Sequence, residues 1–512
     1  MTNERKWSTE QEAIFSWFAT GTGSLVVRAR AGTGKTTTII EGVTRAREAW
    51  EGGRILLAAF NKVIAQELAK RLADRGAVHV EAKTLHSLGY ACIRRHKRSL
   101  RITEERPWDL ADYGIGCVSD GYGGIPREVR GLVRTLHTRL RETDPHVVQL
   151  DRTAAIQRAV DVAVDADVYP DDETIQAGWD VTRVARAALY AVDQAAEPTV
   201  EIDFADMIYL PLAWDCTRRD YAMVVVDEAQ DMTTSQLELA LRCMQEAGRA
   251  AIVGDDRQAI YGFRGADSGS LDRLKAELKA EELGLRTTYR CATSVVQAAQ
   301  RYVPDIVAAS EAQAGSVALV RESDFAKDVR EGDFVLSRKN APLVQYALQF
   351  FREGRRVHIR GRDLGKTLAA IVRRQKAVNL EHLTDKLDRW VDKERQRCAP
   401  LGESGERQLE KVLDLVDFIA EVMKDNEIAT VDQLEEAITG LFADDGDEGS
   451  VMLATIHKAK GLEAERVFVL QDTFTREGPE ETNLRYVAVT RAKNDLRLVS
   501  SEAPAAPIVR PS

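Results

Sequence analysis

One segment constrains the fold more than any other: the run SLVVRARAGTGKTTTIIEGV at residues 24–43. An apolar stretch, a short loop with glycines and a helical pattern follow one another, which indicates a strand, a turn and a helix. Gly32 and Gly34 let the backbone turn so that its N–H groups face an anion, and the helix starting near Lys35 adds its positive dipole end. Lys35 supplies a charge for β- and γ-phosphates, and Thr36 supplies a hydroxyl for Mg²⁺. The segment therefore predicts a phosphate-binding loop within an α/β fold.

A pair of adjacent acids follows another apolar run. MVVVDEAQD (223–231) places Asp227 and Glu228 at the end of a predicted buried strand. An acid at the carboxyl end of a strand beside a phosphate loop can hold Mg²⁺, and the next glutamate can orient or deprotonate the attacking water. Gln230 and Asp231 follow in the same turn. With the loop, these residues predict a site for a nucleoside triphosphate and Mg²⁺.

The other apolar runs are short, and each precedes a helical or loop segment. Buried parallel strands have this pattern, because helices cover both faces of their sheet. Such runs occur at residues 24–29, 54–60, 223–229, 250–255, 333–338, 466–472 and 496–501. Helix-rich stretches at about 103–200 and 363–448 interrupt them. The sequence therefore predicts an α/β fold with two parallel-sheet cores, each carrying a helical insertion.

Composition narrows the class of protein. The 512 residues include no apolar run near the ~20 residues that span a membrane, and the start of the chain lacks a signal-peptide core, so a soluble cytoplasmic protein is expected. The net charge of −10 argues against wrapping duplex with the whole surface, but it permits a basic track along one strand. Six cysteines without a CxxC pair argue against a zinc site or a disulfide framework.

Short motifs follow one another in order from Gln11 to Arg497. They are STEQEAIF (8–15), ARAGTGKTT (29–37), LLAAFNKVIAQELAKRL (56–72), TLHSLGYA (84–91), DEAQD (227–231), VGDDRQAIYGFRGAD (253–267), RTTYRC (286–291), ATIHKAKGLEAERVFVL (454–470) and LRYVAVTRAKNDL (484–496). Together they resemble the motifs of the UvrD/Rep/PcrA family of superfamily 1A DNA helicases, whose phosphate loop commonly begins with Ala, as Ala29 does here. The resemblance implies two RecA-like P-loop cores that hydrolyse ATP between them.

The resemblance implies a role for each nucleotide-site residue. Gln11 would read the adenine, Tyr289 would cover it and Glu463 would contact the ribose. The phosphate loop would contribute Ala31, Gly32, Thr33, Gly34, Lys35, Thr36 and Thr37, and Thr36 and Asp227 would hold Mg²⁺. The catalytic set would be Lys35, Asp227, Glu228, the γ-phosphate sensor Gln258, and the two arginines Arg290 and Arg491 of the second core.

The resemblance also implies residues that contact the DNA strand. These are Phe60, Asn61, His86, Tyr261, Phe263, Arg264, Thr455 and His457. The chain departs from the family pattern at Arg257, Ala259 and Phe263, where relatives carry an acid, Ser and Trp. Arg30 occupies a position where relatives often carry Gly, and the sequence leaves open whether it points at the nucleotide.

The motifs and helix-rich stretches predict domain boundaries. The first core comprises residues 1–102 and 201–280 with an insertion at 103–200. The second comprises 281–362 and 449–512 with an insertion at 363–448, which is shorter than usual for the family. The expected activity is that of an ATP- and Mg²⁺-dependent translocase and helicase that moves 3′ to 5′ on single-stranded DNA and acts at junctions with duplex. Because the chain ends soon after its last motif, no C-terminal nuclease domain is expected.

Alternatives remain open at this stage. One is a helicase or ATPase subunit that works with a nuclease partner in DNA repair or in anti-phage defence of the Gabija kind. Another is a metabolic P-loop kinase, which would have no use for the second core's motifs. Two basic stretches, at 91–101 and 351–362, are either phosphate tracks or solvated surface.

Overall fold

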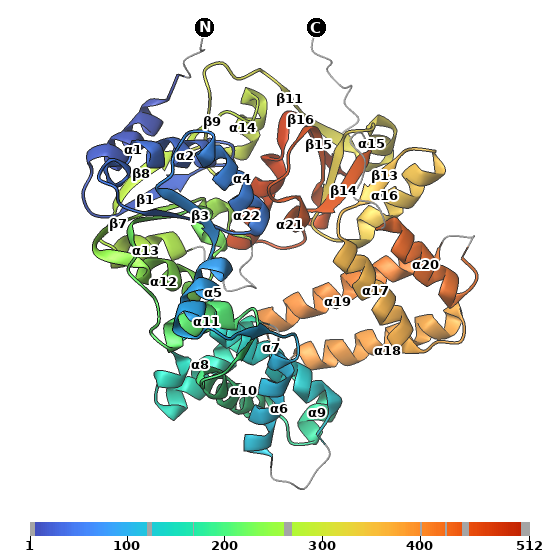
Figure 1. Cartoon of the computed structure of the whole chain (residues 1–512). Coiled ribbons are helices and arrows are strands. Elements are labelled where there is room, and N and C mark those ends of the chain that lie inside the picture. Colours follow the sequence, from blue (N-terminus) through green and yellow to red (C-terminus); the bar gives the residue numbers. More distant parts are fainter. Residues whose placement is uncertain are drawn as a thin grey trace. The chain divides into compact units, whose positions relative to one another are not determined.

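The computed structural model describes residues 6–119, 125–166, 168–260, 269–399, 402–424, 428–442 and 450–502. Contacts divide the chain into two units. One combines Met1–Arg30 with Gly34–Arg286, and the other combines Ala31–Thr33 with Thr287–Ser512. Each unit is built on its own sheet, and Figure 1 shows the first mainly in blue to green and the second in yellow to red.

The first unit contains a six-stranded sheet in the order β3-β2-β6-β7-β1-β8. Its strands are β1 (Leu25–Ala29), β2 (Ile55–Ala59), β3 (Val80–Thr84), β6 (Tyr221–Val226), β7 (Met244–Gly254) and β8 (Glu281–Leu285). All neighbouring pairs run parallel, for example Leu25 with Ala251 in β1 and β7. The inner strands β1, β2 and β6 are mostly apolar, and β7 is apolar from Ala250 to Gly254, since helices bury both faces of the sheet there.

Two layers of helices cover this sheet (Figure 1). One face packs against α1 (Thr9–Thr20), α2 (Lys35–Arg45) and α4 (Lys62–Ala73). The other packs against α5 (Leu85–His96), α11 (Asp206–Ala213), α12 (Thr234–Arg242) and α13 (Ser270–Glu277). The short α3 (Arg47–Trp50) follows α2. The sheet therefore lies between helices on both sides, as the parallel pattern predicts.

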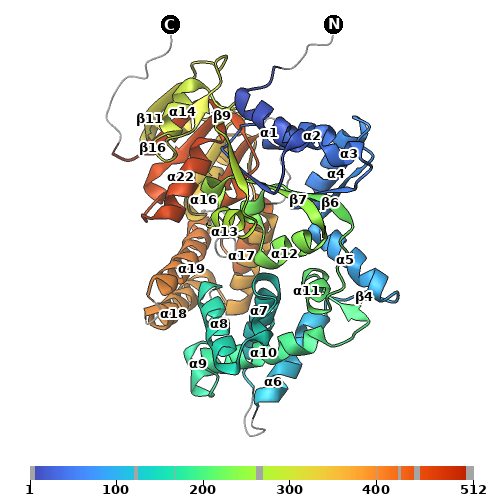
Figure 2. The same cartoon turned by 90° about the vertical axis from the view of Figure 1, so that its left-hand side faces the viewer.

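In the sequence of the first unit, a group of helices lies between two short strands, and Figure 2 shows these helices close together in its lower part. The strands β4 (Arg101–Ile102) and β5 (Glu201–Ile202) pair in parallel, with Ile102 opposite Ile202. The helices between them are α6 (Arg106–Val118), α7 (Arg127–Thr143), α8 (Arg152–Asp165), α9 (Asp172–Gln176) and α10 (Val181–Ala196). They share an apolar core of their own, which extends to α11 through Met207, Tyr209 and Leu210.

A buried ion-pair cluster ties these helices to the sheet region. The Arg141 side chain in α7 is fully buried, and its guanidinium lies 2.8 Å from Asp203 Oδ2 and 2.6 Å from Asp206 Oδ1. Arg106 in α6 also pairs with Asp206. Because Asp203 follows β5 and Asp206 begins α11, the cluster fixes α6 and α7 to the chain that returns to the sheet.

The second unit contains a six-stranded parallel sheet in the order β11-β16-β15-β12-β14-β13. Its strands are β11 (Ser316–Arg321), β12 (Phe334–Ser337), β13 (Val357–Ile359), β14 (Val451–Thr455), β15 (Ala464–Leu470) and β16 (Ala492–Ser500). Near it lie α14 (Thr293–Ala299), α15 (Glu322–Asp328), α16 (Ala341–Arg352), α21 (Ile456–Ala459) and α22 (Pro479–Val489), and a short ladder of β9 (Thr287–Thr288) with β10 (Val307–Ala308).

The chain between β13 and β14 is helical where it is described. It forms α17 (Arg362–Gln375), α18 (Leu380–Cys398), α19 (Gly402–Met423) and α20 (Val431–Leu441). Asp414 of α19 accepts the backbone N–H groups of Asn340 and Ala341 at the start of α16, at 2.8 and 3.0 Å. A carboxylate at a helix N-terminus is stabilised by the helix dipole, so this contact anchors α19 to the sheet region.

The α/β fold with two parallel sheets is confirmed, and all seven predicted strands lie in these sheets. The prediction omitted β3, β8, β11, β13 and β14. The exact domain boundaries stay predictions. Among the helices of the described ranges, none combines the length and apolar composition needed to cross a membrane.

The buried cluster predicts a large loss of stability on substitution. Arg141→Ala leaves Asp203 and Asp206 without their main counter-charge in a buried setting, which should lower the free energy of unfolding by about 3–5 kcal/mol. As a control, Arg158→Ala removes a pair with Asp144 whose arginine is 45% exposed, and should cost less than about 1 kcal/mol. Urea denaturation measures both. Equal losses would mean that the cluster does not anchor the helices.

Candidate functional site

Parallel pairing places the candidate residues of the first unit along one edge of its sheet. The carboxyl ends of parallel strands share an edge, and neighbouring strands lie about 4.8 Å apart. In strand order, this edge carries His86 just after β3, Phe60 and Asn61 after β2, Asp227 and Glu228 after β6, Asp255 and Gln258 after β7, and the phosphate loop after β1. The residues predicted to bind the nucleotide therefore occupy one part of the edge. The residues predicted to contact DNA that follow β2 and β3 occupy another part.

The phosphate loop turns through two left-handed residues. Gly32 has φ +71° and Gly34 has φ +78°, and α2 begins directly afterwards at Lys35. A side chain in this backbone region costs about 1–2 kcal/mol, so glycine is favoured at both positions. Ala31 and Thr33 are buried, while Thr36 and Thr37 are half-buried. The loop thus has the strand–turn–helix form that the sequence predicts.

Lys35 lies against the two acids that follow β6. Its Nζ donates to Glu228 Oε2 at 2.8 Å, and its side chain is 10% exposed. Burial opposes its charge, but the carboxylates of Glu228, Asp255 and Asp227 outweigh this and raise the pKa of Lys35. Glu228 has φ +54°, a strained conformation for a residue with a side chain. Glu228 therefore supplies most directly the negative charge that the buried Lys35 requires.

Asp227 and Thr36 provide oxygen donors that fit Mg²⁺. Thr36 Oγ1 donates to Asp227 Oδ2 at 3.3 Å, and burial together with the neighbouring Glu228 carboxylate raises the pKa of Asp227 to about 7. A divalent cation would offset this crowding of negative charge. Mg²⁺ at nucleotide sites takes one or two carboxylates plus phosphate oxygens rather than an all-protein cage. The donor set agrees with that mode of binding.

Gln11 is held in a defined orientation at the start of α1. Ser8 N donates to Gln11 Oε1 at 3.0 Å, and Gln11 N donates to Ser8 Oγ at 3.2 Å, which forms a capping box. The amide Nε2 donates to Thr38 Oγ1 of α2 at 3.1 Å. Because the Oε1 atom accepts a backbone N–H, the Nε2 atom must point toward α2. This places an amide edge beside the phosphate loop.

A glutamine that had no assigned role in the sequence connects the acids after β6 and β7. Gln230 is fully buried, and its Nε2 donates to Glu228 Oε2 at 2.5 Å. Its Oε1 accepts Asp255 N at 3.0 Å. Gly254 makes this approach possible, since a Cβ there would lie 2.7 Å from Gln230 Oε1. Gln258 follows one turn later and donates from Nε2 to Asp255 Oδ2 at 2.6 Å.

The predicted DNA-contacting residues of the first unit that are described follow the neighbouring strands β2 and β3. The Phe60 side chain is 37% exposed, Asn61 caps α4 by accepting Ile64 N, and His86 is half-buried. The His86 ring lies 5.8 Å from that of Phe204, which is 68% exposed. Sequence reasoning missed Phe204. Its position depends on the neighbouring Asp203 and Asp206, which the buried cluster holds in place, and no local sequence pattern indicates that cluster.

Three further residues predicted to contact DNA lie outside the described residues: Tyr261, Phe263 and Arg264. Of the departures from the family pattern nearby, Arg257 is partly exposed and pairs with Asp256. Ala259 is buried.

The predicted nucleotide residues of the second unit gather at the amino ends of two strands. Glu463 precedes β15 and Arg491 precedes β16, and these strands pair with Ala464 opposite Ala492. Arg290 Nε lies 2.5 Å from Glu463 Oε2, and Lys493 Nζ lies 3.2 Å from Glu463 Oε1. Arg290 is thus neutralised by the same carboxylate that was predicted to contact a ribose.

Arg491 is almost fully buried. Its guanidinium donates to the carbonyls of Val487 at 3.0 Å and Leu462 at 3.1 Å. Burial and the like charge of Arg290 lower the pKa of Arg491 to about 10. Tyr289, by contrast, is 47% exposed, as a stacking platform requires.

Thr455 and His457 lie at the opposite edge of the same sheet. Thr455 ends β14 at its carboxyl end and is the residue before α21, in which His457 is half-buried. In the second unit, the residues predicted to bind the nucleotide therefore lie one β-strand length away from the residues predicted to contact DNA.

The two basic stretches are partly engaged in local pairs. In the first, Arg95 pairs with Asp220 at 2.8 Å. In the second, Arg355 donates to the carbonyls of Ala326 and Val329, and Arg356 pairs with Glu331 at 2.8 Å. These arginines stabilise loops of their own units. This favours a role in the protein surface over a role in a phosphate track for them.

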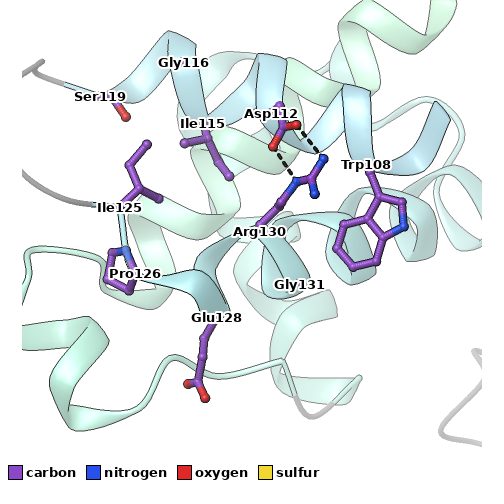
Figure 3. Close-up of a pocket in the computed structure, with 10 residues that line it drawn as sticks. All are labelled: Trp108, Asp112, Ile115, Gly116, Ser119, Ile125, Pro126, Glu128, Arg130 and Gly131. Atoms are coloured by element: carbon purple, nitrogen blue, oxygen red, sulfur yellow. Dashed lines mark hydrogen bonds and ion pairs between the residues drawn. The ribbon is translucent and has the colours of Figure 1, made fainter. Parts of the chain in front are cut away.

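An open pocket of about 650 Å³ lies away from these residues, between α6 and α7 (Figure 3). Trp108, Ile115 and Ile125 line it, and Arg130 makes two hydrogen bonds to Asp112 at its wall, both at 2.7 Å. The pocket contains no phosphate loop or acid pair, so its size does not make it a nucleotide site.

Comparisons with known proteins agree with the motifs. A family model of the UvrD/REP helicase N-terminal domain matches residues 7–279, and one of the UvrD-like helicase C-terminal domain matches residues 271–503. F-box DNA helicase protein 1 of Schizosaccharomyces pombe is 24% identical over 550 aligned positions, which cover 97% of this chain and 58% of that protein.

Bacterial relatives show the same level of identity. ATP-dependent DNA helicase UvrD2 of Mycobacterium tuberculosis is 25% identical over 562 positions, which cover 93% of this chain and 76% of that protein. ATP-dependent DNA helicase Rep of Escherichia coli is 25% identical over 296 positions, which cover 54% of this chain and 41% of that protein. The chain thus spans between about two fifths and three quarters of the length of these relatives.

Proposed function

Because this chain belongs to the UvrD/Rep family of ATP-dependent DNA helicases, we propose that it hydrolyses ATP to move along single-stranded DNA and to separate duplex at junctions. One observation carries the proposal: the phosphate loop, the acid pair and the aromatic residues Phe60 and His86 lie along one edge of one sheet. A site with this layout can link the state of a nucleotide to the grip on bases, because both are attached to the ends of neighbouring strands.

The first chemical step is an exchange of partners at Lys35. Its Nζ leaves Glu228 for the β- and γ-phosphates, since these carry more negative charge than one carboxylate. Glu228 then becomes available to orient the attacking water and accept its proton. Thr36 and Asp227 would hold Mg²⁺, which supplies positive charge to the phosphate oxygens when bound. Gln258 senses the γ-phosphate from the end of β7.

The second unit contributes the remaining groups to ATP turnover. Arg290 exchanges Glu463 for phosphate, as Lys35 exchanges Glu228, and leaves Glu463 to contact the ribose. Arg491 stabilises the charge that develops during phosphoryl transfer. Tyr289 stacks on the adenine that Gln11 reads. These roles rest on the family resemblance together with the local pairs.

We assign residues 1–102 and 201–280 to the first core and 281–362 and 449–512 to the second, with insertions at 103–200 and 363–448. The polarity that accompanies this motif set in the resemblance is 3′ to 5′. Thr455 and His457 hold the strand in the second core, while Phe60, Asn61, His86 and Phe204 hold it in the first. A nuclease partner stays a prediction.

The proposal predicts ATP hydrolysis that rises sharply with single-stranded DNA. Lys35→Ala should lower the stimulated rate at least about 100-fold, because it removes the charge that stabilises the phosphates in the transition state. Lys70→Ala, which alters an exposed lysine of α4, should have little effect. A phosphate-release assay with and without oligo-dT measures this. A rate that oligo-dT does not change would refute the motor.

Polarity is tested with duplexes that carry a 3′ tail, a 5′ tail or no tail. Strand displacement should require ATP and a 3′ tail, and Lys35→Ala should abolish it. The physical reason is that the protein must load on the tail and move toward the junction. Displacement only from the 5′-tailed duplex would overturn the polarity. If no strand is displaced from any of the three duplexes, the proposed activity is restricted to translocation.

Phe204 should contribute to the grip on bases. Stacking of a base on an aromatic side chain is worth about 1–3 kcal/mol, so Phe204→Ala should raise the Kd for oligo-dT roughly 5- to 150-fold. Phe204→Tyr should retain most of the affinity. Val78→Ala is the control, since Val78 is 83% exposed but precedes β3, at the other edge of the sheet. Fluorescence anisotropy of labelled oligo-dT measures all three, and an unchanged Kd for Phe204→Ala would remove Phe204 from the track.

A further inference from the structure

Arg30 lies within the phosphate loop but is directed at acids after a neighbouring strand. Its Nη1 is 2.8 Å from Asp256 Oδ1 and 3.4 Å from Asp255 Oδ1, and its side chain is 6% exposed. The register explains this contact. β1 and β7 pair in parallel with Arg28 opposite Gly254, so the residues that follow each strand emerge side by side.

Asp255 is the centre of this arrangement. Its side chain is fully buried, its Oδ2 accepts Gln258 Nε2 at 2.6 Å, and its Oδ1 accepts Arg257 N at 3.1 Å. Its own N–H donates to Gln230, which in turn donates to Glu228. Asp255 therefore joins the predicted γ-phosphate sensor to the carboxylate that holds Lys35.

A buried carboxylate of this kind needs positive charge nearby. Burial raises the pKa of Asp255, and Lys35 and Arg30 oppose this effect. An uncompensated buried charge is strongly destabilising. The two cations differ in one respect: Lys35 faces the phosphates and would turn its charge to them, whereas Arg30 is committed to the acids after β7.

We propose that Arg30 is a positioning residue, which holds the Asp255 carboxylate and, through it, the amide of Gln258 in the orientation that detects the γ-phosphate. This inference rests on the proposed ATP hydrolysis. Arg30 does not touch the nucleotide in this role. It keeps the sensor aligned at the moment when Lys35 is engaged by phosphate.

Strand β1, which ends just before Arg30, provides a matched control. Arg28 lies two residues earlier in β1 and pairs with Asp256, Asp272 and Glu282 at 3.3, 2.5 and 3.2 Å. Its partner Asp272 is 70% exposed, and Arg28 makes no contact with Asp255 among those described. Removing Arg28 thus deletes a nearby charge that shares Asp256 with Arg30, but it leaves the contact between Arg30 and Asp255, which supports Gln258, in place.

The test compares Arg30→Met with Arg28→Met by two readouts. The first is the ratio of the Kd for ADP to the Kd for β,γ-imido-ATP, measured without DNA. The second is kcat and KM for ATP with oligo-dT. Removing a direct transition-state donor costs 10²–10³-fold, so a residue that acts through another should cost less, about 10-fold in kcat and in the Kd ratio. KM and the Kd for ADP should change little, because ADP lacks the sensed phosphate.

Arg30→Lys should restore most of the Kd ratio, since an ammonium can still pair with the two acids. Arg28→Met should resemble the unmodified protein in both readouts. Arg30→Gln replaces Arg30→Met if the latter fails to fold, as judged by thermal unfolding, and the same losses are expected.

Two results would overturn the proposal. One is an unchanged Kd ratio and kcat in the neutral Arg30 variants. The other is a parallel loss of affinity for ADP and for β,γ-imido-ATP, because Arg30 would then only support the loop. If the unmodified protein shows no DNA-stimulated hydrolysis, the proposed function fails, while the nucleotide ratio still decides the role of Arg30.

Discussion

The parallel pairing of every strand in the first sheet is the constraint on which the site depends. It brings the ends of β6, β7 and β1 to one edge, where Asp227, Asp255 and Lys35 meet although roughly two hundred residues separate each acid from the lysine in the sequence. Charges collected in this way must compensate one another before any ligand arrives. The pairs Lys35–Glu228 and Arg30–Asp255 meet that requirement.

Under the proposed function, these internal pairs make nucleotide binding an exchange rather than a simple addition. Lys35 already lies in a charged hydrogen bond, and Arg290 lies against Glu463, so each cation would give up one anion for another. Exchange keeps the largely buried Lys35 paired with an anion throughout, whereas an uncompensated buried charge would cost several kcal/mol. The left-handed backbone at Glu228 is strained, and this strain lies next to the carboxylate that would release Lys35.

The sequence predicted the parts of the structure that are encoded locally. The apolar runs of β1, β6 and β7 identified inner strands, because these are buried on both faces. The edge strands β3 (VEAKT) and β8 (EELGL) escaped prediction, since one side of each faces no neighbouring strand and polar residues are tolerated. The direction of Arg30 and the exposure of Phe204 depended on the register of β1 with β7 and on the Arg141 cluster, and neither is visible in a local pattern.

The short ladder of β4 with β5 has a consequence for how such chains can diversify. Ile102 lies opposite Ile202, so the points where the chain leaves and re-enters the sheet region are neighbouring strands, about 5 Å apart. Because the two strands run parallel, they need a crossover connection of about a dozen residues or more, and the helices α6 to α10 provide it. The ladder holds the two ends of this connection side by side. The length and surface of these helices can change over evolution, or be exchanged by design, without altering the register of the strands that carry the proposed catalytic groups.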